Sequence, residues 1–146
     1  MWRDIVNEND LKDFMERIHF FHDSCIKELK YVSGAYVNDD LSMYPLNDKR
    51  ILDVIIQCQY DDLSMIEMRF IGLKCLKLFP IAEDYTCEIL DSTMFLKDGS
   101  VYWCDCGDLS EKDFDNYEGI FICASKLRWR PIENQMGQED FYLSIK

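Results

Sequence analysis

The stretch Arg50–Phe70, RILDVIIQCQYDDLSMIEMRF, decides the fold of this chain. Apolar and polar residues alternate on either side of Asp61-Asp62, a pair that predicts a turn. The residues predicted to fall on one face are Leu52, Val54, Ile56, Cys58 and Tyr60 in the first segment and Ile66, Met68 and Phe70 in the second. Glu67 and Arg69 fall on the opposite face. Two segments of period two joined by a short polar turn predict a pair of antiparallel strands.

Strand-like segments continue on both sides of this pair. Upstream, Cys25–Val37 predicts one strand, bent near Ser33-Gly34, and residues 39–48 predict a loop. Asp98-Gly99 between two apolar runs predicts a tight hairpin. The further predicted strands are Leu73–Phe79 after a bend at Gly72, Cys87–Leu96, Ser100–Cys104 and Ile120–Arg130. In the last of these, one face is predicted to carry Phe121, Cys123, Leu127 and Trp129.

One amphipathic helix precedes the strands. Asn7 or Asn9 can cap it, and the pattern ends near residues 19–22. Its apolar stripe consists of Leu11, Phe14, Met15 and Ile18. Strands without helices between them exclude repeated βαβ units. The sequence therefore predicts a single α+β domain over residues 1–146, in which the helix packs on a curved, mainly antiparallel, half-barrel-like sheet of six to seven strands.

The charge of the chain favours some partners over others. The 146 residues include 28 acids and 16 bases, for a net charge of −12. Residues 1–73 and 74–146 each hold 14 acids and 8 bases, so the excess is not an acidic tail. Such a field repels nucleic acid and anionic membranes and speeds encounter with basic proteins. We therefore expect a protein partner, plausibly basic, and neither nucleic acid nor a membrane. Acidity that only keeps the protein in solution is the alternative.

The cysteines bear on localisation. There are seven, an odd number, and the chain opens with Met1-Trp2-Arg3-Asp4 rather than with the apolar run of a signal peptide. Free thiols persist in reducing compartments. The sequence therefore predicts a cytoplasmic protein.

An acidic loop is predicted between the last two strands, at residues 105–119. Its acids are Asp105, Asp108, Glu111, Asp113, Asp115 and Glu118. Their spacing does not fit a calcium-binding loop. We predict that these acids bind a partner, with Tyr102, Trp103 and Tyr117 as aromatic anchors. A solvated loop without a binding role is the alternative.

Two short segments contain residues that are typical of metal or thiol chemistry. His19, His22 and Asp23 are candidate metal ligands, but they lack an obvious further partner. The same residues are equally typical of a junction between a helix and a strand. Ser24 and Cys25 follow them, and either could pair with His22 as a nucleophile. Cys104 and Cys106 are separated by one residue, whereas metal and redox motifs use two. We therefore expect no metal, no other cofactor and no catalytic residue.

Part of the sequence resembles known proteins. The residues that carry the resemblance are Phe21-His22-Asp23-Ser24-Cys25-Ile26, Tyr31, Ser33-Gly34-Ala35-Tyr36-Val37 and Leu127-Arg128-Trp129. They resemble a group of small bacterial domains in which an aromatic-His-Asp segment leads into the first strand. The layout is also similar to the single-domain immunity proteins of bacterial toxin systems. The resemblance implies a cytoplasmic, non-enzymatic bacterial protein.

Three functional hypotheses follow. The leading one is a non-enzymatic acidic protein-binding module, of the immunity type that inhibits a basic bacterial toxin. The second is a small metal- or thiol-dependent enzyme that uses His22, Asp23 and Cys25. The third is a homo-oligomeric structural or sensory domain, for example a homodimer that pairs through an exposed sheet edge.

Overall fold

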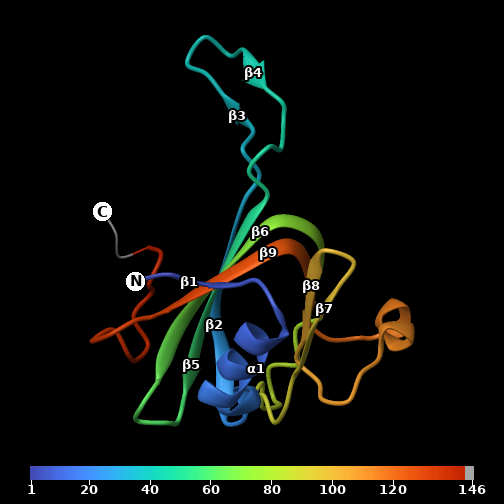
Figure 1. Cartoon of the computed structure of the whole chain (residues 1–146). Coiled ribbons are helices and arrows are strands. Elements are labelled where there is room, and N and C mark those ends of the chain that lie inside the picture. The colour runs from blue at the N-terminus through green and yellow to red at the C-terminus, as the bar shows by residue number, and fades with distance from the viewer. Residues whose placement is uncertain (144–146) are drawn as a thin grey trace.

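The computed structural model describes residues 1–143, and within that range the chain has an α+β fold (Figure 1). One α-helix, α1 (Glu8–Arg17), accompanies an open, curved sheet of seven antiparallel strands in this part of the chain. The strands are β1 (Arg3–Ile5), β2 (Ser24–Val32), β5 (Ile51–Cys58), β6 (Met65–Lys77), β7 (Thr93–Lys97), β8 (Ser100–Cys104) and β9 (Phe121–Pro131). The predicted fold class is therefore confirmed.

The strand order shows how the sheet is built. It runs β2-β5-β6-β9-β8-β7, and β1 also pairs with β9. Along one edge of β9, residues 121–124 pair with β8, whereas residues 127–129 pair with β1. The expected hairpin at Asp98-Gly99 joins β7 to β8. Strand β9 thus pairs with both β1, which precedes the helix, and β8 of the β7-β8 hairpin.

The inner face of the sheet holds the main core. Asn7 caps α1 as predicted, because its side chain accepts a hydrogen bond of 2.9 Å from the backbone N–H of Asp10. The helix then buries Leu11, Phe14 and Met15 against the sheet, among them Phe14 with 1% exposure. The alternating strand residues that meet them are Leu52, Val54, Ile56, Ile66, Met68 and Phe70, all buried as predicted. Cys58 and Tyr60, predicted on the same face, are only partly buried, because β5 ends at Cys58.

Several predicted strands have different bounds. The predicted strand Cys25–Val37 is interrupted at Val32, and Leu73–Phe79 is not separate but continues the single strand β6. Residues 87–92 lie outside the named strands, so only 93–96 of the predicted strand Cys87–Leu96 belong to β7, which ends at Lys97. Polar Asp91-Ser92 interrupts the apolar run there, and the Ser92 hydroxyl donates to the backbone oxygen of Phe20 at 3.1 Å.

A bend redistributes the apolar residues of β9. Phe121 and Cys123 do not share a core with Leu127 and Trp129, which corrects the prediction of one common face. Opposite this point, Gly72 of β6 has φ = 66°, a left-handed conformation that glycine adopts without strain. The pairing register also shifts between Leu73 and Cys75. The residues of β9 that face the main core therefore change from Leu127 and Trp129 to Ile122 and Ala124 across this bend.

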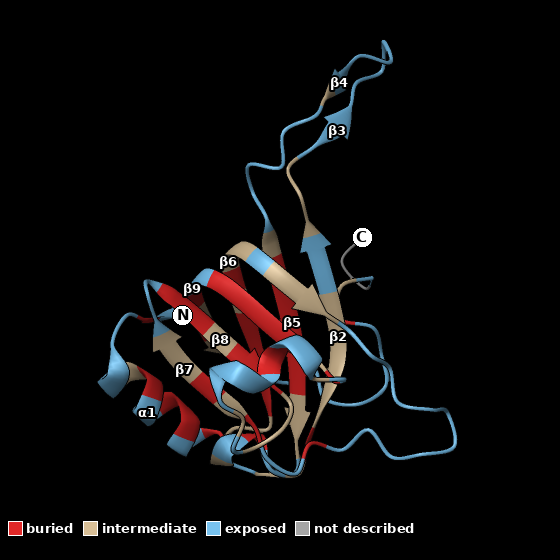
Figure 2. Ribbon diagram, turned by 90° about the vertical axis from the view of Figure 1, so that its right-hand side faces the viewer, coloured by how far each residue is buried: buried red, intermediate tan, exposed pale blue. Residues whose placement is uncertain are grey.

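The outer face is covered in two places. Residues 105–120, which we call the acidic loop, cover one end through a cluster around Phe114 and Phe121. The loop contains a 3-10 helix, η2 (Glu111–Asn116). Ile55 and Met65 at the other end are covered by Phe141 of the C-terminal segment. Both faces of the sheet are thus buried, as Figure 2 shows for the central strands.

A row of ion pairs lies on the outer face between these two covers. Arg69 of β6 forms a bidentate pair with Asp53 of β5 at 2.8 and 2.9 Å. Glu67, although it faces outwards as predicted, is only 2% exposed and pairs with Arg130 at 2.7 Å. The Trp2 ring stacks on the Arg130 guanidinium, 4.6 Å from the ring centroid. Burial of these carboxylates is tolerated because each has a charged partner.

One segment leaves the body of the protein altogether. Residues 33–50, which we call the arm, project away from the sheet (Figures 1 and 2). The arm contains a two-stranded ribbon of β3 (Tyr36–Val37) and β4 (Met43–Tyr44). The predicted loop at 39–48 is thus part of an antiparallel extension, in which the Tyr36 and Tyr44 rings stack 5.1 Å apart.

Candidate functional site

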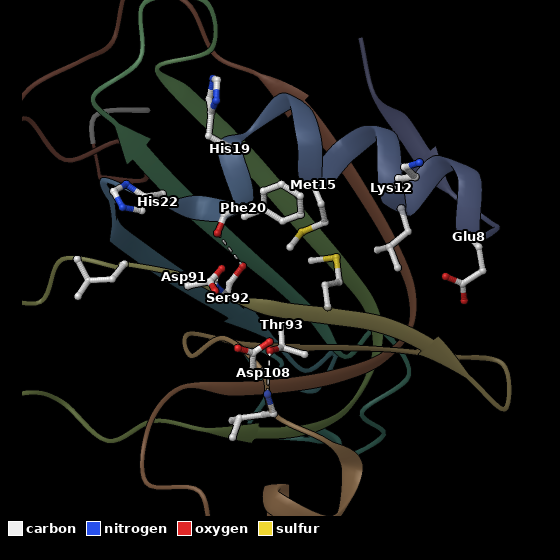
Figure 3. A pocket seen from close by; sticks show the side chains of 14 residues that line it. Glu8, Lys12, Met15, His19, Phe20, His22, Asp91, Ser92, Thr93 and Asp108 are labelled. Atoms are coloured by element: carbon white, nitrogen blue, oxygen red, sulfur yellow. Dashed lines mark hydrogen bonds between the residues drawn. The ribbon is translucent and has the colours of Figure 1, made fainter.

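A groove of about 840 Å³ lies between the helix and the entry into β7 (Figure 3). One wall is formed by α1 and by the 3-10 helix η1 (His19–Phe21) that follows it. The other wall is formed by residues 90–94 and by Asp108-Leu109 of the acidic loop. We call this feature the groove. It brings together three elements that are distant in the sequence.

The lining of the groove combines apolar and charged side chains. Its apolar residues are Leu11, Met15, Phe20, Leu90, Met94 and Leu109. Its charged residues are three carboxylates, Glu8, Asp91 and Asp108, and one ammonium group, Lys12, which lies on α1 with Glu8. Asp108 and Asp91 lie on one wall, and His22 and Phe20 on the other (Figure 3). The lining is therefore apolar with an excess of negative charge, a chemistry that suits a ligand with both apolar and cationic groups.

A left-handed turn shapes the helical wall. His19, Phe20 and Phe21 have φ values of 51°, 54° and 63°. Each such residue costs about 1–2 kcal/mol relative to a right-handed conformation, so neighbouring contacts must hold the turn. Phe21 supplies them, because it is 1% exposed and packs edge to face on Phe14 at 5.9 Å. As a result Phe20 is 50% exposed and points into the groove (Figure 3).

The candidate metal ligands do not converge. Nδ1 of His22 lies 3.0 Å from Oδ2 of its neighbour Asp23, whereas Nε2 of His19 lies 3.6 Å from Oδ1 of Asp62. The His19 ring also stacks on Tyr60, 3.8 Å between centroids. Among residues 1–143, no three His, Cys, Asp or Glu side chains are arranged to hold a metal ion. The two histidines thus serve separate contacts at the turn.

The candidate thiols are not activated. Cys25 lies in another hollow, with Cys58 and Cys87 rather than with His22. Burial raises the pKa of Cys25, of Cys104 and of Cys106, which lowers the fraction of reactive thiolate. The sulfur of Cys104 instead donates to the Cys106 backbone oxygen at 3.4 Å. The described geometry therefore gives the thiol hypothesis no support.

Three acids of the acidic loop are engaged within the protein. Asp105 accepts hydrogen bonds from the Tyr117 hydroxyl and from the N–H of Ile120. Asp113 accepts from the N–H and hydroxyl of Ser110, both at 2.9 Å, and these bonds lower the pKa of Asp113. Glu111 pairs with Lys97. Of the other three predicted acids, Asp108 faces the groove, and Asp115 and Glu118 are exposed.

The predicted aromatic anchors are buried or half-buried in contacts within the protein. Trp103 is 0% exposed and packs on Phe21, so it offers no surface to a partner and is removed from the candidate site. The Tyr102 ring lies 4.8 Å from the Phe95 ring and 6.0 Å from the Phe114 ring. Tyr117 is half-buried, and burial together with its hydrogen bond to Asp105 raises its pKa. The sequence did not reveal that the loop would fold back on these rings.

Most of the groove was not predicted from sequence. Only His19, His22 and Asp108 belong both to the predicted candidates and to its lining. Residues 90–94 were predicted to lie in a regular strand, although polar Asp91-Ser92, which interrupts the apolar run, was a signal against it. The contribution of Glu8 and Lys12 depends on where α1 lies on the sheet, which local sequence does not determine.

No known protein family, curated protein or solved structure matches this chain. Among residues 1–143, no helix is both long enough and apolar enough to cross a membrane.

Proposed function

We propose that this protein is an acidic binding module whose groove holds a short extended segment of another protein. The segment would carry alternating basic and apolar side chains. The observation that supports this most directly is the lining of the groove, where three carboxylates lie beside a row of apolar side chains. Apolar contacts would supply most of the affinity, and the carboxylates would set charge preference and association rate.

The specific partner that we propose is a basic bacterial toxin, which would make the protein an immunity-type inhibitor. The net charge of −12 supports this form of the proposal, because it accelerates encounter with a basic protein. The resemblance of residues 21–37 and 127–129 to small bacterial domains supports it as well. A cytoplasmic location is part of the same proposal, and the seven cysteines, which are all free thiols in the structure, are consistent with it.

Fluorescence anisotropy with a defined peptide tests the groove. The probe is a labelled nine-residue peptide of alternating lysine and leucine, and the control peptide replaces each lysine by glutamate. We expect micromolar binding of the first peptide and none of the second. The double variant Asp91→Asn/Asp108→Asn should weaken binding about fivefold or more, since it removes two charges from the groove.

A matched variant separates the groove from the general acidity of the protein. Asp115→Asn/Glu118→Asn also removes two negative charges, but from exposed positions outside the groove lining. This variant should change the dissociation constant less than about twofold, because exposed charges at a distance are screened. An equal loss in both variants would show a diffuse electrostatic background and refute the groove as the binding site.

A further inference from the structure

The arm exposes several large apolar side chains. Its large apolar residues that are more than half exposed are Tyr36, Val37, Leu41, Met43 and Leu46. They occupy both faces of the ribbon, because Tyr36 is paired with Tyr44 and Val37 with Met43. Of the buried core clusters in residues 1–143, none includes an arm residue. A two-stranded ribbon that packs on nothing is only marginally stable in water.

Local contacts nevertheless keep the arm regular. The N–H of Asn38 donates to the Ser42 oxygen at 2.9 Å, and the Tyr44 hydroxyl donates to Asp48. The base is fixed where the N–H groups of Lys49 and Arg50 both donate to the Ser33 oxygen at 3.0 Å. The arm is therefore an ordered ribbon whose apolar side chains are not covered by the rest of the described chain.

We infer that the occupant of this surface is the arm of a second copy of the chain, in an antiparallel two-fold pairing. The two edges of the ribbon are not equivalent. Pro45 follows β4 directly and lacks an N–H, so that edge is poorly suited to further pairing. The β3 edge has no proline, and it is free to pair with another strand. Two β3 strands related by a two-fold axis run antiparallel and form a four-stranded ribbon.

The charges of the arm are complementary to themselves in this arrangement. Asp39 and Asp40 lie at the tip, whereas the base holds Lys49 and Arg50 together with Asp48, whose carboxylate accepts the hydrogen bond from Tyr44, so the base carries a net positive charge. Eight extended residues separate the two ends by about 25 Å. When two arms lie antiparallel, the acidic tip of one meets the basic base of the other, and both contacts form by symmetry. This local attraction opposes the repulsion between two bodies of charge −12.

The five exposed side chains offer on the order of 500 Å² per chain. Edge-to-edge pairing covers only the part of this area that flanks the β3 edge, so the interface falls below the size of standard specific interfaces and the dimer is expected to be weak. The arm and α1 lie at opposite ends of the molecule (Figure 1). Pairing through the arm therefore leaves the groove open.

Sedimentation velocity of the full chain between 1 and about 200 µM tests the dimer. We expect a concentration-dependent dimer with a dissociation constant in the micromolar range. A monomer over the whole range would overturn the inference.

Charge reversal at either end of the arm tests the geometry. Asp39→Lys/Asp40→Lys makes both ends basic, and Lys49→Asp/Arg50→Asp makes both ends acidic. Each variant alone should dimerise about tenfold or more weakly, whereas an equimolar mixture of the two should form a heterodimer about as tight as the wild type. Glu83→Lys/Asp84→Lys is the matched control, since it makes the same charge change at exposed residues outside the arm.

The remaining outcomes all contradict the pairing. Single variants that dimerise like the wild type would exclude the arm as the interface. Weakened variants that do not recover on mixing would exclude the antiparallel arrangement. If Glu83→Lys/Asp84→Lys weakened the dimer as much as Asp39→Lys/Asp40→Lys, the effect would come from overall charge and not from contacts of the arm. Unchanged thermal unfolding of each variant verifies that the fold is intact.

Discussion

The acidic loop and the arm are two polar connections between strands that use their side chains in opposite ways. The acidic loop folds back, buries Phe114 at 5% exposure and engages Asp105, Asp113 and Glu111 within the protein. The arm extends into solvent and leaves Leu41 83% exposed. The number of acids in a loop therefore does not measure its capacity for recognition. What distinguishes the two is whether the rest of the chain covers the apolar residues.

The largest expected difference concerns the aromatic residue that anchors each region. Phe114 stacks on Phe95 at 5.5 Å and lies 4.7 Å from the Phe121 ring, so Phe114→Ala should lower the free energy of unfolding by about 3–4 kcal/mol. Tyr44→Ala in the arm should cost less than about 1 kcal/mol, because that ring contacts only its own ribbon. Urea unfolding of both variants measures the difference. Equal losses of free energy of unfolding in the two variants would contradict the difference in packing between the acidic loop and the arm.

A smaller difference is expected between two acids of the same loop. Asp105→Asn weakens the acceptor for the Tyr117 hydroxyl and for the Ile120 N–H, and should cost about 2 kcal/mol. Asp108→Asn should change stability by less than about 0.5 kcal/mol, since Asp108 is exposed at the groove. Thermal and urea unfolding of the pair tests this. If Asp108→Asn were the more damaging change, the assignment of Asp105 as the internal acid would be wrong.

Alkaline titration offers a third test. Burial raises the pKa of Tyr117 and of Tyr142 above the ordinary tyrosine value of about 10. A raised pKa means that the neutral hydroxyl stabilises the fold below the unfolded pKa, and that this contribution is lost as the pH rises beyond it. We therefore expect stability to fall above about pH 10 and these two rings to ionise only on unfolding. Tyr117→Phe should reduce the pH dependence of stability above about pH 10. An ultraviolet titration in which all tyrosines ionise together without unfolding would contradict the raised pKa values of Tyr117 and Tyr142.

The smallest effect is expected at the tip of the arm. Leu41→Ser should alter the free energy of unfolding by less than about 0.5 kcal/mol, because the side chain is almost fully exposed in the monomer. The measurement must be made at low micromolar concentration, where association does not contribute. A loss of more than about 1 kcal/mol would show that the tip is packed.

Much of the fold could be predicted from local sequence. The alternation in Arg50–Phe70, the Asp98-Gly99 turn and the Asn7 cap each depend on neighbours in the chain, and each was confirmed. The bend at Gly72 could be anticipated from the glycine. Its effect on β9, where Phe121 and Leu127 face different cores, could not, because it arises from pairing with a distant strand.

The candidate site was harder to predict for the same reason. His22 and Asp108 are separated by 86 positions, and only the packing of the helix against the entry into β7 places both in the groove. Local sequence also could not show that Trp103 would be enclosed by the core, since an aromatic residue next to an acidic loop is equally typical of a surface. Exposure depends on tertiary packing, which composition does not encode.

The row of ion pairs on the outer face has a consequence for strand register. Asp53 lies directly opposite Arg69, and Glu67 lies directly opposite Arg130. A slip of β5 against β6 by two residues would keep every apolar side chain on its own face, so hydrophobic alternation cannot prevent it. Such a slip would place Asp53 opposite Glu67 or opposite Ile71, which leaves buried carboxylates repelling each other or unpaired. The buried charges therefore select one alignment among those that the apolar pattern allows.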